Sequence, residues 1–97
     1  MRYLALMAAL TAFAFSSAAS AEGDFITECD ALVSHPEDPD RIAPGVSDVL
    51  LVAGRAACEA AVAEDPENRR LRYQLGRVLF YSASTTESLP HLEFAAE

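Results

Sequence analysis

Residues 69–81, RRLRYQLGRVLFY, show a clear helical pattern. Its larger aliphatic side chains recur every three or four residues, at Leu71, Leu75, Val78 and Leu79. This spacing is typical of one apolar face of an α-helix. The sequence therefore predicts a helix over this segment that packs against other helices.

Similar patterns predict helices on both sides of this segment. Residues 49–64 are rich in alanine, and small side chains of this kind allow another helix to approach closely. Residues 65–68 predict a turn, and residues 82–86 predict a second one. A last helix is expected over residues 87–97, with its inward side chains at Leu89, Leu92, Ala95 and Ala96.

A shorter helix is expected nearer the N-terminus, capped by Asp24 and beginning near Phe25. It ends before His35-Pro36, because a residue that precedes proline is disfavoured in a helix. The segment from Ser34 to Asp48 holds three prolines and predicts a long loop packed against its neighbours. The apolar face of the short helix comprises Phe25, Cys29, Leu32 and Val33. Since no segment is typical of a strand, we predict an all-α fold of antiparallel helical hairpins.

The charge balance restricts the kind of partner. The 97 residues include 7 arginines, no lysine and 15 acidic residues, which gives a net charge of −8. Nucleic acids and anionic membranes attract basic surfaces, so neither is expected as the main partner.

The first 21 residues have the pattern of a signal peptide. A positive charge at Arg2 precedes an apolar run from Leu4 to Phe15, and small residues end in Ala19-Ser20-Ala21. A run of roughly a dozen residues is too short to cross about 30 Å of hydrocarbon as a helix. We therefore expect cleavage after residue 21, no stable membrane insertion afterwards, and a periplasmic or secreted protein.

The sequence also contains an internal repeat. Three pairs of positions in the second and last predicted helices lie 34 residues apart: Gly54 with Ser88, Cys58 with Leu92, and Ala61 with Ala95. Residues 72–81, which contain Leu75-Gly76, together with Ser88, Leu92 and Ala95, resemble one repeat of the tetratricopeptide or Sel1-like family. The resemblance covers residues 49–97 and implies an α-solenoid fragment whose second helix lies against Gly76.

The sequence departs from the family pattern at several places. Arg72 replaces a bulky aromatic residue, residues 82–86 lack the usual glycine, and Pro90 falls early in the last helix, where it can delay or kink it. Residues 22–48 fit no repeat and are expected to form an irregular helix and an acidic, proline-rich loop. Because a repeat array needs a polar capping helix, we expect the repeat region to be incomplete after Glu97.

One stripe of the third predicted helix suggests a binding groove. Arg70, Tyr73, Arg77 and Phe80 follow helical spacing, and in the resembled family this face takes up peptide segments. Arginine recognises carboxylates, so the resemblance implies a protein or peptide partner with an acidic or C-terminal carboxylate segment. The alternative is that Arg70 and Arg77 pair with acids within the chain, such as Glu59 or Glu64.

Cys29 and Cys58 are the two cysteines of the chain. In an oxidising compartment an even number of cysteines predicts a disulfide. A loop of this size would gain about 3–4 kcal/mol in the chain-entropy model. A zinc site is not expected, because it would need four ligands at close spacing. Catalytic thiol chemistry is not expected either, because neither cysteine has a basic neighbour to lower its pKa.

The motifs of the common catalytic sites are missing from the sequence. His35 and His91 stand alone, and the acidic loop from Glu37 to Asp40 lacks the ligand ladder of a calcium site. We therefore expect no catalytic residue, metal or cofactor, and an exported helical-repeat protein that mediates protein–protein interaction. Two alternatives stay open: the accessory region of a larger exported enzyme, and a small structural protein that self-associates through its C-terminal helix.

Overall fold

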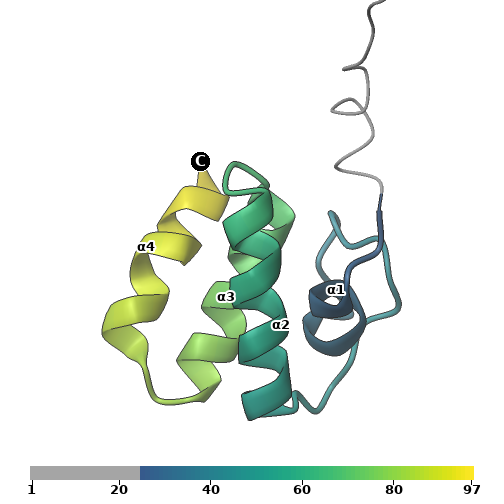
Figure 1. Ribbon diagram of the computed structural model, residues 1–97, viewed down its shortest axis with the longest axis horizontal. Helices are drawn as coiled ribbons and strands as arrows, with labels where there is room; N and C mark the ends of the chain where they lie inside the picture. The colour runs from purple at the N-terminus through teal and green to yellow at the C-terminus, as the bar shows by residue number, and fades with distance from the viewer. Residues whose placement is uncertain (1–24) are drawn as a thin grey trace, which may run out of the picture.

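The computed structural model describes residues 25–97, which form four helices and no strand. The helices follow one another in a row from α1 on one side to α4 on the other (Figure 1). The all-α prediction is confirmed, whereas the predicted signal peptide lies outside the described residues. The bounds are α1, Glu28–Val33; α2, Leu51–Glu64; α3, Arg69–Tyr81; and α4, Thr85–Ala96.

Helix α3 is the centre of the fold and has the predicted bounds. The side chain of Asn68 accepts a hydrogen bond from the backbone N–H of Leu71 at 3.1 Å, which caps the first turn. Helix α3 contacts each of the other three helices. The predicted apolar face is buried, at Leu71, Leu75, Val78 and Leu79.

Helix α1 begins later than predicted, and its cap is Thr27. The Thr27 hydroxyl accepts a hydrogen bond from the backbone N–H of Asp30, and the Asp30 carboxylate accepts one from the backbone N–H of Thr27 at 2.8 Å. This reciprocal capping box fixes the start of the helix at Glu28. The expected cap, Asp24, lies outside the described residues. Phe25 precedes the helix and is 63% exposed, so its predicted place on the apolar face is wrong.

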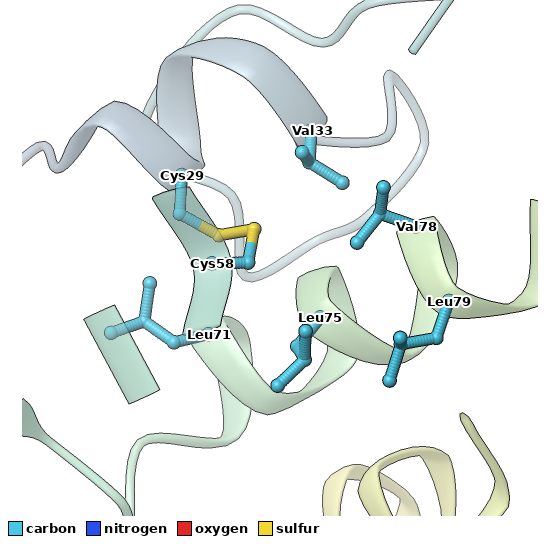
Figure 2. Packing of buried hydrophobic residues seen from close by; sticks show 7 residues of the cluster. All are labelled: Cys29, Val33, Cys58, Leu71, Leu75, Val78 and Leu79. Carbon is cyan, nitrogen blue, oxygen red and sulfur yellow. A yellow bond between two sulfur atoms is a disulfide. The ribbon is translucent and has the colours of Figure 1, made fainter. Parts of the chain in front are cut away.

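The predicted disulfide is present and joins α1 to α2. Cys29 and Cys58 are fully buried, and their Cα atoms are 4.6 Å apart. Figure 2 shows the disulfide beside Val33 of α1 and the apolar side chains of α3. A covalent link at this place holds a helix of six residues, which is far below the length that is stable alone.

Residues 34–50, between α1 and α2, form no helix and pack against the helices. The backbone N–H of Val46 donates to the Ser34 carbonyl at 2.8 Å, which closes the loop on itself. Ala43 is buried within it. Arg77 of α3 donates from Nη2 to the Val46 carbonyl at 3.1 Å, so the loop also packs against a helix, as expected.

The turn between α3 and α4 is tighter than predicted. The backbone N–H of Ser84 donates to the Leu79 carbonyl at 2.9 Å and that of Ala83 to the Phe80 carbonyl at 3.1 Å, which forms a Schellman motif. Ala83 adopts a φ of 64°, where glycine is usual. Helix α4 begins at Thr85, not at residue 87, so Pro90 lies inside it without delaying its onset.

The inward face of α4 is narrower than predicted. Leu92 and Ala95 are partly buried, but Leu89 is 49% exposed and Ala96 is also exposed. Among the described helices α4 packs against α3 and meets α2 through an exposed ion pair between Glu87 and Arg55 at 3.3 Å, so one narrow apolar stripe is covered. A Cβ at Gly76 would lie 2.5 Å from Leu92 Cδ2, which confirms that Gly76 allows the close approach of α4.

Within residues 25–97, no helix is long and apolar enough to cross a membrane.

Candidate functional site

A buried polar cluster joins α1 to α3. Three polar side chains of α3 at helical spacing, Arg70, Gln74 and Arg77, face α1 and the loop that follows it. They are at most 7% exposed, and Asp30 and Ser34 opposite them are fully buried. We call these five residues the polar cluster.

The strongest contact in the polar cluster is the ion pair between Arg70 and Asp30. The guanidinium donates from Nε to Asp30 Oδ1 at 2.7 Å and from Nη2 to Oδ2 at 3.2 Å. Two parallel hydrogen bonds of this kind satisfy both carboxylate oxygens and fix the relative orientation of the two side chains.

The Asp30 carboxyl has a pKa below its ordinary value of 3.8. Burial alone would raise this pKa, because it disfavours the charged form. The hydrogen bonds from Arg70 and Thr27 and the charge of Arg70 outweigh the burial, so the carboxylate stays ionised.

Gln74 connects both ends of α1. Its amide nitrogen donates to Asp30 Oδ1 at 3.2 Å, and its amide oxygen accepts from the Ser34 hydroxyl at 3.0 Å. The amide nitrogen also lies 3.3 Å from Cys29 Sγ of the disulfide. A fully buried glutamine is therefore satisfied at both of its polar atoms, as a buried polar side chain must be.

Arg77 binds backbone carbonyls instead of a carboxylate. Its Nη1 donates to the carbonyls of Val33 and Ser34 at 2.8 and 2.9 Å, and its Nη2 donates to the Val46 carbonyl at 3.1 Å. The first two are carbonyls at the C-terminal end of α1, where a cation is favourable. Arg77 thus closes α1 and holds the following loop.

The predicted groove residues divide between the interior and the surface. Arg70 and Arg77 are buried in the polar cluster, Tyr73 is partly buried, and Phe80 is 53% exposed. Arg70 pairs with Asp30, so the acids proposed as internal partners were wrong; Glu59 pairs with Arg55 of the same helix at 2.9 Å.

Asp30, Ser34 and Gln74 were not singled out from the sequence. Asp30 and Gln74 lie 44 residues apart in the sequence, and no local pattern relates them. The available signal was the Thr27-to-Asp30 spacing of a capping box, which would have placed a carboxylate at the start of α1.

A surface pocket of about 260 Å³ lies beside the polar cluster, between the acidic loop, α3 and the end of α4. Two of the four predicted groove residues, Arg70 and Tyr73, line it, whereas Arg77 and Phe80 do not. We call it the loop pocket. Its other lining residues include Asp38, Asp40, Arg69, Leu92 and Ala95.

Arg72 of α3 contacts the turn that precedes α3 and two side chains of α4. Its Nε donates to the Pro66 carbonyl at 2.8 Å, and its guanidinium carbon lies 4.2 Å from the centre of the Phe94 ring. Its Nη1 is 3.4 Å from His91 Nδ1. Partial burial and the charge of Arg72 together lower the pKa of His91 below 6.5.

Within residues 25–97, the His, Cys, Asp and Glu side chains nowhere gather in a group of three that could hold a metal ion. Searches with protein-family models, curated proteins and solved structures found no significant match to the chain. The resemblance to tetratricopeptide or Sel1-like repeats therefore stays a prediction from the sequence.

Proposed function

We propose that the chain is an exported, non-catalytic helical-repeat protein that mediates protein–protein interaction or assembly in the periplasm. The observation that carries this proposal is the order of helix contacts. Each helix contacts the next, and α1 also contacts α3, so α3 of the second helix pair packs against both helices of the first pair. Stacking of neighbouring helix pairs is the principle of α-solenoids, whose exposed faces serve as binding surfaces.

Burial at the repeated positions supports the same proposal. Gly54 and Ser88, which are 34 residues apart, are both buried, and Ala61 and Ala95 are both partly buried. Gly54 lies where a Cβ would be 2.9 Å from Val33 and 3.5 Å from Val78, so it sits between α1 and α3. Two of the three repeated pairs thus share their degree of burial, whereas Cys58 is fully buried in the disulfide and Leu92 is only partly buried.

The disulfide supports export. A disulfide persists in an oxidising compartment and is rare in the cytosol. Cys29 and Cys58 are fully buried in the core, where their disulfide bond holds α1 to α2. A fold that depends on this bond is suited to the periplasm or the cell exterior.

A second candidate function is self-association, which is favoured by exposed apolar side chains near the start of α2 and the end of α3. Val52 is 88% exposed, and four other large apolar side chains in these turns are at least 40% exposed: Leu50, Leu51, Phe80 and Tyr81. Exposed apolar side chains of this kind occur at interfaces between proteins.

Site-specific photo-cross-linking in the native cell tests the proposal. A benzophenone amino acid would replace Phe80 or Ala96, two exposed residues near the candidate surfaces, and Ala63, an exposed residue of α2, as a control. Adducts with another identified exported protein from position 80 or 96, but not from 63, support the interaction function. Adducts of twice the chain's mass support self-association instead, and no adduct above the control level contradicts both functions.

A further inference from the structure

The loop pocket has uncompensated acidic groups on one wall. Asp38 Oδ1 accepts a hydrogen bond from the backbone N–H of Asp40 at 3.0 Å, but its Oδ2 is buried without a hydrogen-bond partner. Asp40 on the same wall is exposed. Because Oδ2 has no hydrogen-bond donor inside the loop, the charge of Asp38 is not neutralised there, and Asp40 adds a second negative charge to this wall.

The arginines that line the pocket are already engaged. Arg70 forms an ion pair with Asp30 in the polar cluster. Arg69 donates from Nε to the Ala95 carbonyl at 3.2 Å, near the C-terminal end of α4. Arg69 keeps its positive charge, because a carbonyl does not neutralise it, but the two carboxylates of Asp38 and Asp40 outnumber that charge, so the pocket as a whole disfavours an anion.

The other walls suit a cation on an aliphatic stem. The last turn of α4 carries the partial negative charge of a helix C-terminus, part of which the hydrogen bond from Arg69 to the Ala95 carbonyl already offsets. The ring of Tyr73 offers an aromatic surface, and Asp38 is close enough to contribute to the raised pKa of Tyr73 after the larger effect of burial. Leu92 adds an apolar contact.

We propose that the loop pocket binds a basic side chain, arginine or lysine, of a partner polypeptide. The inference rests on the proposed interaction function and names the chemistry of its partner. A volume of about 260 Å³ accommodates one long side chain. The net charge of −8 favours the approach of a basic partner. The preference is opposite to the acidic partner expected from the sequence, because Arg70 and Arg77 are used inside the fold.

A peptide titration tests the proposal on the purified, disulfide-bonded protein. The probe is an acetylated and amidated pentapeptide with a central arginine, compared with the same peptide carrying citrulline or glutamate there. Citrulline keeps the shape of arginine without its charge. Binding is followed by the amide shifts of Asp38, Tyr73 and Leu92 in ¹H–¹⁵N spectra, at low and at physiological salt.

Two variants with matched charge separate the pocket from general attraction. Asp38→Asn combined with Asp40→Asn removes the acidic wall, while its amide oxygen at position 38 can still accept the loop hydrogen bond. The control, Asp48→Asn with Glu37→Gln, removes the same number of carboxylates from exposed positions of the same loop that do not line the pocket. We expect saturable arginine-dependent shifts, an affinity loss on the order of tenfold in the Asp38–Asp40 variant, and little change in the control.

Three results would overturn the inference: stronger binding of the glutamate peptide, equal binding of the citrulline peptide, or equal losses in both variants. Photo-cross-linking of the Asp38–Asp40 variant keeps the two proposals apart. If it still captures its partner protein while the peptide titration fails, the basic-side-chain inference is wrong and the interaction function stands. If neither the native protein nor the variant captures a partner, the interaction function itself fails.

Discussion

Asp30 on α1 and Arg70 on α3 form a two-point ion pair in which the carboxylate is fully buried and the guanidinium is 7% exposed. The pair fixes a helix of six residues on the central helix of the fold. It also turns inward a charge that the resemblance to helical repeats placed in a binding groove. The interior of this protein is therefore held by a specific polar contact as well as by apolar packing.

Removing one partner of this pair should strongly destabilise the fold. We expect Arg70→Leu to lower the free energy of unfolding by about 3–5 kcal/mol, because Asp30 stays buried without its counterion. Urea unfolding of the oxidised protein measures the change. Arg55→Leu is the control: its ion pairs with Glu59 and with Glu87 of α4 are exposed to solvent, so their loss should change the stability little. Equal losses in the two variants would contradict the role of the buried pair.

The same pair predicts a loss of stability in acid. The folded-state pKa of Asp30 lies below its ordinary 3.8, so on acidification the unfolded chain binds this proton before the folded chain does. The stabilisation is complete above pH 3.8 and is lost as the pH falls through the folded-state pKa. Urea unfolding in pH steps from 6 to 2 should show this loss in the native protein. An Asp30→Asn variant with an equally steep decline would disprove the assignment.

Ala83 offers a stabilising substitution. Its φ of 64° costs an L-residue about 1 kcal/mol or more, which glycine avoids. We expect Ala83→Gly to raise the free energy of unfolding by about 1 kcal/mol. Ala60→Gly, at an exposed position inside α2, should lower it by about the same amount, because glycine weakens a regular helix. Thermal unfolding of both variants distinguishes these opposite signs.

The disulfide should contribute a large part of the stability. Cys29→Ala with Cys58→Ala removes a link across 29 residues, and we expect a loss of about 3–4 kcal/mol. The intact mass of the native exported protein, with and without reduction, first establishes that the bond is formed in the cell. Free thiols in the native protein would contradict it.

The sequence predicted what local patterns determine. The periodicity of residues 69–81 predicts α3, and the even number of buried cysteines predicts the disulfide. The direction of Arg70 could not be predicted in this way, because its partner lies 40 residues earlier. Leu89 was misplaced for a related reason: helical spacing suggests an apolar stripe but does not say how much of it a neighbouring helix covers.

Gly76 tests how closely α3 and α4 must pack. A Cβ there would lie 2.5 Å from Cδ2 and 2.7 Å from Cγ of Leu92, so the leucine or the helix that carries it must move. Alanine favours a helix by about 1 kcal/mol over glycine, but overpacking costs about 1–3 kcal/mol, so we expect Gly76→Ala to be destabilising overall. In a Leu92→Ala background the clash is gone and the same substitution should become stabilising. Urea unfolding of the two single variants and the double variant measures this coupling between the two sites. Additive effects would show that Gly76 is not required for the contact between the helices.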